Sequence, residues 1–317
     1  MSETFPPVTV VIPARPGQTE VNAVAASRQL NYPTDRLEII VARGHHPSVQ
    51  RNAALREARG ELIYFLDDDS VPLPGNLRRA VSHFSRPEVQ MIGGPALRPP
   101  DSPALERVFA LVMGSWLAFG PSRARYQAVG RLRETGEKEL ILCNLLARRS
   151  TLAEAGGFDE ALYPNEENAL MDAVQLQGGR LLYDPELIVH RRPRRSLPDF
   201  VKMLMTYGRG RAEQFRLHPT TGSALNFVPP LFCVYLVLTP VLPAWCLWPW
   251  LGYALALMGQ GIVLKNEPAV FKVCAIPLIF VSHLFYGFGF WRGLFTRLER
   301  TEPRTSGNVL LERVQGL

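Results

Sequence analysis

Three consecutive aspartates, Asp67, Asp68 and Asp69, directly follow the apolar run Leu62–Leu66. Adjacent carboxylates repel one another unless a cation lies among them. Because Asp67 and Asp69 are two residues apart, both can turn toward one divalent ion where the chain leaves a strand. Mg²⁺ and Mn²⁺ bind a few carboxylates together with phosphate oxygens and water. Asp and Ser also form solvated turns, so these residues alone leave two interpretations, an acidic turn or a metal site for a phosphorylated substrate.

A strongly cationic stretch lies between positions 191 and 216, where eight basic residues stand against two acidic ones. Such a density of positive charge favours phosphate, carried either by nucleic acid or by anionic lipid headgroups. Neither an interleaved set of stacking side chains nor a nucleic-acid-binding motif accompanies the charge. We therefore expect a membrane with anionic lipids, and no nucleic acid, as the partner of this stretch.

The first part of the chain alternates between strand-like and helix-like segments, which predicts an α/β fold. Short β-branched runs at Val8–Ala14 and Leu37–Ala42 predict strands, and Ser48–Arg59 predicts a helix that Ser48 caps and Gly60 ends. The run Glu61–Leu66 predicts a strand that delivers the aspartates to its C-terminal end, the edge where open α/β sheets bind ligands. Further strands are predicted at 140–148 and 180–190, and the stretch 102–139 predicts no particular element.

Residues 227–264 carry no charged side chain over 38 positions, about twice the roughly 20 residues that one helical span needs. The Pro and Trp cluster "LPAWCLWPW" near the middle suits a turn at an interface, which predicts a helical hairpin. A third apolar stretch, 269–291, is interrupted only by Lys272 and His283. An even number of spans would keep the arginines that follow it on the inner side, which would make this stretch re-entrant or interfacial.

Between these parts, the segment 196–225 predicts a basic amphipathic helix and a linker. Ser196 and Asp199 resemble a capping box at its start. An apolar face beside many arginines is typical of a helix that lies in a membrane interface; the alternative is a helix packed on the preceding domain with a solvated basic face. The apolar face consists of Phe200, Met203, Leu204 and Tyr207.

The order of five motifs, "VTVVIPAR", "LEIIV", "RNAALREARGELIYFLDDDS", "GGFDEALYPNEEN" and "LLYDPELIVHRRP", resembles the family 2 glycosyltransferases of the GT-A fold, in particular their membrane-attached branch. The likeness covers residues 7–195. It implies a mostly parallel mixed sheet flanked by helices, a nucleotide-sugar donor, and transfer of a sugar to an acceptor hydroxyl. It also implies a divalent cation, Mn or Mg, on Asp67 and Asp69, with Asp68 near the ribose or the sugar.

The resemblance further implies a catalytic base at an acidic pair that begins a helix, here Glu166 and Glu167 of "NEEN". An inverting transfer needs a base on the face of the sugar opposite the leaving group. We assign this base to Glu167, with Glu166 as the second choice. The alternative is a solvated helix start, where carboxylates favour the macrodipole.

Other donor-site residues are also implied by the resemblance. Arg51 stands where the family often places a basic residue against the donor phosphates, and Pro13 and Arg15 flank the expected nucleobase pocket. His190 matches a position that reaches the metal or the diphosphate in some GT-A enzymes. A helix-surface arginine and a capped strand-end histidine are the alternatives for Arg51 and His190.

The sequence departs from the family pattern at Arg43, where most relatives have an aspartate that accepts a hydrogen bond from the base. Arginine cannot accept a hydrogen bond. Either a backbone carbonyl reads uracil, or Arg43 contacts phosphate, or the donor base is not uracil. A UDP-sugar is the favoured donor on the resemblance.

These observations predict a cytoplasm-facing enzyme of the inner membrane, with several membrane passes, that transfers one sugar to a lipid-linked saccharide on polyprenyl diphosphate for cell-surface polysaccharide. The "QxxRW" motif of processive synthases is absent from the sequence, which favours single transfer. The alternatives are a polyprenyl-phosphate sugar synthase and a non-catalytic membrane-anchored protein that binds phosphate or lipid. The lipid phosphates are expected on Arg194, Arg195, Arg209 and Arg211.

The predicted organisation has four parts: a GT-A domain at 1–195, the interfacial helix and linker at 196–225, membrane segments at 226–295, and a C-terminal tail at 296–317.

Overall fold

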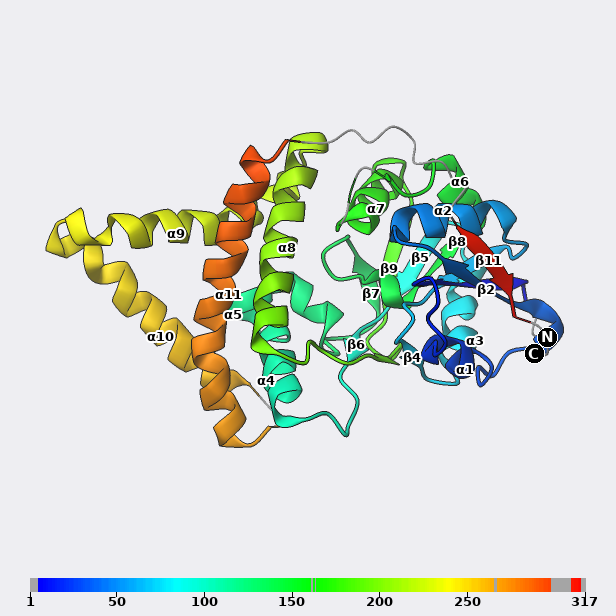
Figure 1. Ribbon diagram of the computed structural model, residues 1–317, viewed down its shortest axis with the longest axis horizontal. Coiled ribbons are helices and arrows are strands. Elements are labelled where there is room, and N and C mark those ends of the chain that lie inside the picture. Colours follow the sequence, from blue (N-terminus) through cyan, green and yellow to red (C-terminus); the bar gives the residue numbers. More distant parts are fainter. Residues whose placement is uncertain (1–4, 161, 163, 265–266, 298–308, 315–317) are drawn as a thin grey trace.

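The computed structural model describes residues 5–160, 162, 164–264, 267–297 and 309–314 (Figure 1). Two β-sheets form the body of the first part of the chain. The larger sheet has the strand order β11-β2-β1-β3-β8-β5-β9-β7, and the smaller has the order β4-β10-β6. The strands of the larger sheet are β11 (Leu310–Arg313), β2 (Leu37–Arg43), β1 (Val8–Ala14), β3 (Leu62–Phe65), β8 (Leu145–Arg148), β5 (Val89–Gly93), β9 (Arg180–Tyr183) and β7 (Arg133–Thr135). Those of the smaller are β4 (Val71–Pro72), β10 (Val189–His190) and β6 (Ala96–Leu97).

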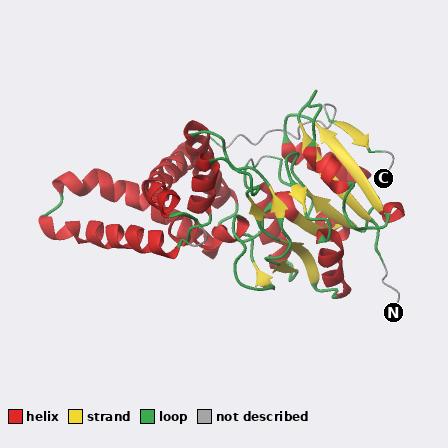
Figure 2. Ribbon diagram, turned by 90° about the horizontal axis from the view of Figure 1, so that it is seen from below, coloured by secondary structure: helices red, strands yellow, loops and turns green. Residues whose placement is uncertain are grey.

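Helices cover both faces of the larger sheet, as an α/β fold requires (Figures 1 and 2). One apolar core lies beneath α1 and α3, and the other lies beneath α2, α6 and α7. Their bounds are α1 (Asn22–Ser27), α3 (Asn76–Ser82), α2 (Pro47–Glu57), α6 (Arg149–Glu154) and α7 (Glu166–Leu176). The strand β1 pairs in parallel with β2 and β3, whereas β8 runs antiparallel to both β3 and β5. The predicted mixed sheet is confirmed, with more antiparallel pairing than the family likeness implied.

Several predicted boundaries differ from the structure for local reasons. Ser48 does not cap α2: its hydroxyl donates to the carbonyl of Leu162, and Pro47 occupies the first helical turn instead. The strand predicted at 140–148 is shorter, because a 3₁₀ turn at Leu142–Asn144 precedes β8. The buried Asn144 amide in that turn donates to the carbonyl of Leu187, which fixes a bend.

The stretch 102–139, for which no element was predicted, contains the helices α4 (Ala104–Met113) and α5 (Trp116–Phe119) and the strand β7. The apolar face of α4 is buried against α8 (Leu197–Leu217) and α11 (Ala269–Phe295), not against the sheet. Phe109 of α4 stacks on Phe200 of α8 with ring centroids 4.2 Å apart. The alternation of strands and helices in the preceding chain therefore does not predict the helices of this segment.

Helices α9 (Val228–Leu238) and α10 (Trp248–Val263) form the predicted hairpin, which projects away from the sheets (Figures 1 and 2). Within the described residues, three helical segments are long and apolar enough to cross a membrane: Gly222–Val241, Ala244–Val263 and Ala269–Phe295. At the start of α8, Ser196 accepts a hydrogen bond from the backbone N–H of Asp199, as the predicted cap requires. The apolar side of α8 packs on α4 and α11.

Glycines allow α8 and α11 to approach closely. A Cβ added at Gly208 of α8 would collide with the backbone of Tyr286 and Phe290 on α11. We expect Gly208→Ala to lower the free energy of unfolding by about 1–3 kcal/mol through overpacking. Thermal unfolding in detergent measures this. The control is Gly259→Ala in α10, where a Cβ meets open space and removal of a helical glycine stabilises by up to about 1 kcal/mol. Equal effects of the two changes would contradict the packing argument.

The strand β11 comes from the segment that the sequence assigned to a C-terminal tail. It forms the edge of the larger sheet and pairs antiparallel with β2, with Glu312 opposite Val41 and Leu310 opposite Arg43. Arg313 forms ion pairs with Glu38 and Glu57. Residues near the end of the chain therefore complete the edge of the sheet that lies beside the β1–α1 loop.

Candidate active site

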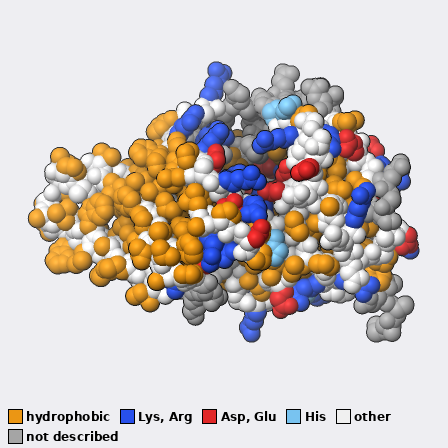
Figure 3. Space-filling model, turned by 60° about the horizontal axis from the view of Figure 1, so that its bottom comes forward, with side chains coloured by type: hydrophobic (Ala, Val, Ile, Leu, Met, Phe, Trp, Pro, Cys, Tyr) orange, Lys and Arg blue, Asp and Glu red, His pale blue; other side chains and the backbone are white. Residues whose placement is uncertain are grey.

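A cleft of about 2250 Å³ lies between the sheet domain and the helices α8–α11. Figure 3 shows basic and acidic side chains gathered in this hollow, beside the broad apolar surface of the hairpin. The cleft is lined at one end by the aspartates after β3 and by the start of α7, and at the other by α8, α9, α10 and α11. One continuous cavity therefore joins the predicted donor site to the apolar helices.

Asp67 and Asp69 converge on one cation, the guanidinium of Arg191. Its Nη2 lies 3.0 Å from Asp67 Oδ2 and its Nε lies 2.8 Å from Asp69 Oδ1. Arg51 adds a second contact to Asp67 at 3.1 Å. Burial alone would raise the pKa of Asp67, but Arg191 and Arg51 outweigh it and the pKa is lowered. The carboxylate of Asp67 is therefore ionised at neutral pH.

This pair of carboxylates fits a divalent cation. They already share one positive group, and two carboxylates with substrate phosphate and water are the ligands that Mg²⁺ and Mn²⁺ take at nucleotide sites. His190 does not join them: its Nδ1 lies 3.2 Å from the carbonyl oxygen of Arg98. In the described ranges, no group of three or more His, Cys, Asp or Glu side chains is arranged to hold a metal. Any ion must therefore rely on the substrate for its remaining ligands.

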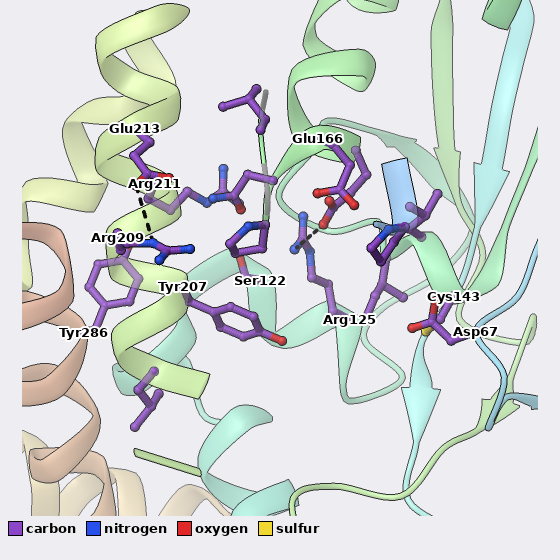
Figure 4. A pocket seen from close by; sticks show the side chains of 18 of the residues that line it. Asp67, Ser122, Arg125, Cys143, Glu166, Tyr207, Arg209, Arg211, Glu213 and Tyr286 are labelled. Atoms are coloured by element: carbon purple, nitrogen blue, oxygen red, sulfur yellow. Dashed lines mark ion pairs between the residues drawn. The ribbon is translucent and has the colours of Figure 1, made fainter. Parts of the chain in front are cut away.

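The two members of the acidic pair at the start of α7 have different environments, and Figure 4 labels the first of them, Glu166. Glu166 is buried and pairs with Arg51 at 2.9 Å, while its Oε2 has no hydrogen-bond partner among the described residues. Glu167 lines the cleft, with Oε1 4.0 Å from Arg125 Nη1. Arg51 thus bridges Asp67 and Glu166, so the structure gives it carboxylate partners where the family likeness implied donor phosphate. Glu167 is the more open carboxylate of the pair.

Burial and the neighbouring Glu167 raise the pKa of Glu166 to about 7. A raised carboxyl pKa means that the folded state binds more protons than the unfolded state between the ordinary pKa and about 7, so stability falls as pH rises through that window. Glu166→Gln removes this titration. We expect the melting temperature of the variant minus that of the wild type to increase as the pH is raised from 5 to 8. A difference that does not change with pH would contradict the raised pKa.

The guanidinium of Arg43 binds other residues of the protein, at the position where most relatives have an aspartate that binds the nucleobase of the donor. Its Nε pairs with Glu312 Oε1 of β11 at 2.8 Å, and its Nη1 donates to the carbonyl of Gln18 at 2.6 Å. The side chain of Gln18, not singled out from the sequence, donates to Asp68 Oδ2 at 2.7 Å. Pro13, Arg15, Gln18 and Asp68 all line the cleft. Arg43 therefore positions the β1–α1 loop at the predicted donor pocket.

Glu312→Gln is expected to raise the KM for the donor about 2–5-fold with kcat unchanged, because a partly exposed ion pair contributes up to about 1 kcal/mol. Steady-state kinetics with varied nucleotide sugar measure this. Glu57→Gln is the matched control, since Glu57 pairs with Arg313 of the same strand at 3.6 Å but does not touch Arg43. If both variants raise KM equally, the increase results from weaker binding of β11 to the sheet and not from loss of the contact between Glu312 and Arg43.

Basic side chains of α8 and of the segment before it also line the cleft, and Figure 4 labels two of them, Arg209 and Arg211. Arg194, Arg195 and Arg209 line it, and Arg209 Nε lies 3.4 Å from Glu213. Arg211 is buried and pairs with Glu137 at 3.0 Å, so it has a structural partner in place of the expected lipid phosphate. Sequence reasoning missed Arg125 and Tyr207, which also line the cleft. Arg125 donates to Asn168, directly after Glu167.

Residues 22–149 match the family model described as Glycosyl transferase family 2. The pre-mycofactocin glycosyltransferase of Mycobacterium tuberculosis is 27% identical over 197 residues, which are 57% of this chain and 38% of that protein. The succinoglycan biosynthesis protein ExoA of Rhizobium meliloti is 26% identical over 192 residues, 60% of this chain and 56% of that protein. The match thus spans about two fifths to just over half of the length of these relatives.

Among solved structures, the mannosyltransferase PcManGT of Pyrobaculum calidifontis, in complex with GDP-Man and Mn²⁺, superposes with a TM-score of 0.56 at 16% identity. The superposition covers 92% of this chain and 88% of that one. At this identity the superposition shows that the two chains share a fold, and its coverage of this chain extends into the C-terminal helices. The family model thus identifies a family 2 glycosyltransferase domain within residues 22–149, and the superposition shows the GT-A fold of the chain.

Proposed function

We propose that this protein is a membrane-attached, cytoplasm-facing glycosyltransferase that moves one sugar from a nucleotide-sugar donor to a saccharide on polyprenyl diphosphate. The observation that carries the proposal is the continuous cleft, which extends from Asp67 and Asp69 to the apolar helices α9–α11. A soluble acceptor would need no such extension. Synthesis of cell-surface polysaccharide is the proposed context, supported by the likeness to a succinoglycan biosynthesis protein.

On the donor side, Asp67 and Asp69 would hold Mn²⁺ or Mg²⁺ with the diphosphate of the nucleotide sugar. A divalent cation bound there supplies charge neutralisation for the leaving nucleoside diphosphate. Asp68 and the loop that Arg43 organises would contact the nucleoside. We favour a UDP-sugar on the family likeness, while the structural relative from Pyrobaculum calidifontis holds GDP-Man.

On the acceptor side, Glu167 would accept the proton of the attacking hydroxyl, and transfer would invert the anomeric centre. Both Glu166 and Glu167 line the cleft, but the side chain of Glu167 is 16% exposed and that of Glu166 only 4%, and Arg51 engages the Glu166 carboxylate, which supports Glu167 in this role. Arg194, Arg195 and Arg209 would face the phosphates of the lipid carrier, because all three line the cleft that joins the aspartates to the apolar helices.

The test is a transfer assay with the full chain in lipid nanodiscs. Radiolabelled nucleotide sugars are offered with Mn²⁺, with Mg²⁺ or with chelator, and the acceptor is a polyprenyl-diphosphate saccharide, bare polyprenyl phosphate or water. We expect a metal-dependent product that carries one added sugar on the diphosphate saccharide. A product with bare polyprenyl phosphate alone would replace the proposal with a polyprenyl-phosphate sugar synthase. If no nucleotide sugar is consumed and anionic lipid still binds, the non-catalytic alternative holds.

A further inference from the structure

Both ends of α11 are tied to the side of the molecule that carries the sheets. Just before the helix, Glu267 pairs with Arg98, which follows β6, and with Arg107 of α4. Near the end of the helix, Arg216 of α8 donates to the carbonyls of Gly293 and Thr296, at 3.0 and 2.5 Å. Beyond it, β11 belongs to the larger sheet.

Between these ends, α11 packs along α8 on one face and presents apolar side chains on the other. The face packed on α8 includes Gly289 and Gly293, where an added Cβ would collide with the backbone of α8, whereas Gly287 packs against Pro229 and Cys233 of α9. The large exposed side chains of α11 are Val270, Val273, Phe288 and Phe295. Along the chain they are 3, 15 and 7 positions apart, and in a helix of 3.6 residues per turn these spacings place all four on one stripe.

The α9–α10 hairpin lies crosswise to this pair of helices. In Figures 1 and 2 it projects away from the sheets, and Figure 1 shows α8 and α11 side by side across its base. Its exposed surface is apolar and aromatic: Val241 is 79% exposed, Trp245 71% and Ile262 82%. A hairpin that follows the membrane normal therefore leaves α11 close to the membrane plane.

We propose that only the α9–α10 hairpin enters the hydrocarbon core, and that α11 lies in the headgroup layer beside α8 with its apolar stripe toward the lipid. A helix of 27 residues is about 40 Å long, so as a span it would carry one end across the roughly 30 Å core. If the start of the helix crossed, Glu267 would lose Arg98 and Arg107. If the other end crossed, the carbonyls of Gly293 and Thr296 would lose Arg216. The molecule thus has both the N-terminal domain and β11 on one face of the membrane.

The partner of this surface is a lipid bilayer and not a second protein chain. The hairpin region 227–264 lacks any charged residue, which suits acyl chains. Arg292 and Arg297, at the end of α11, and the arginines of α8 would then all remain on the anionic, cytoplasmic side. A transmembrane α11 would move one group of them to the opposite face.

Depth-dependent fluorescence quenching tests the orientation. Single cysteines at Val273, Leu284 and Phe295 are labelled in a Cys246→Ser, Cys274→Ser background and reconstituted into vesicles that contain lipids spin-labelled at graded depths. We expect the same shallow depth for all three positions. Val237→Cys in the hairpin is the deep reference, and Ser82→Cys in α3 is the unquenched one. A profile in which position 284 is deepest would overturn the proposal, and so would the absence of quenching along α11.

Labelling of the two ends gives an independent readout. Val270→Cys and Arg297→Cys are treated with a membrane-impermeant maleimide in inverted vesicles and in intact spheroplasts. Both ends should react on the face that exposes Ser82→Cys, and neither on the other face. Reaction of the two ends on opposite faces would mean that α11 crosses the membrane. Melting temperatures within a few degrees of wild type show that each variant is folded.

Discussion

Asp69→Asn is expected to reduce sugar transfer by at least about 10²–10³-fold, the usual cost of removing a group that stabilises leaving-group charge. Asp69 and Asp67 converge on a single cationic point at the end of β3, and the loss of one charge leaves only one carboxylate for a divalent ion. The measurements are transfer with saturating Mn²⁺ and Mn²⁺ binding by electron paramagnetic resonance. Both should fall together.

Asp35→Asn is the matched control, since this exposed carboxylate pairs only weakly with Arg36, at 3.6 Å, and lies outside the cleft. It removes the same charge and should leave transfer unchanged. Arg191 loses one partner in Asp69→Asn, so a melting curve is recorded for each variant. Full transfer and full Mn²⁺ binding by folded Asp69→Asn would refute the proposed metal role of the aspartates.

Glu167→Gln is expected to lower kcat by about 10²–10⁴-fold with little change in donor KM, because the amide cannot take the acceptor proton. Glu166→Gln should instead act on both the donor site and stability, since its carboxylate holds Arg51, which in turn contacts Asp67. Steady-state kinetics of both variants with the diphosphate-linked saccharide separate the two roles. A larger kcat loss in Glu166→Gln would exchange their assignments.

The acceptor supplies an internal control for the base. A bare polyprenyl phosphate is already ionised at neutral pH and needs no base, so Glu167→Gln should hardly slow any transfer to it. Retention of full kcat with a hydroxyl acceptor would show that Glu167 does not remove the proton.

The strands of an α/β fold and the location of the aspartates could be predicted because their signals are local, whereas the GT-A fold was implied by the resemblance that the order of the motifs carries. The β-branched runs of β1 and β2 and the apolar run before Asp67 each specify a strand within a few residues. The absence of charge over 227–264 specified the hairpin in the same way. The acidic pair at the start of α7 followed from its place in the order of motifs, and the structure brings it near Asp67 through Arg51.

The remaining features depend on contacts between distant segments, which no local pattern encodes. Arg191 meets Asp69 across 122 positions, and Glu312 meets Arg43 across 269. Arginine at position 43 is incompatible with the usual acceptor role, but its actual partner lies in a four-residue strand with no pattern of its own. Helix α4 was missed because its apolar face is buried by helices that come more than 80 residues later.

The pairing of β11 with β2 has a consequence for the order of folding. At a synthesis rate of roughly 5–20 residues per second, β2 leaves the ribosome about 15–50 s before its edge partner, 269 positions later, is made. During that interval the hairpin is already available to the membrane, while an edge of the sheet still exposes unpaired backbone groups. Pairing of β11 with β2 can therefore form only after residues 310–313 have been made, later than every other described strand of the larger sheet.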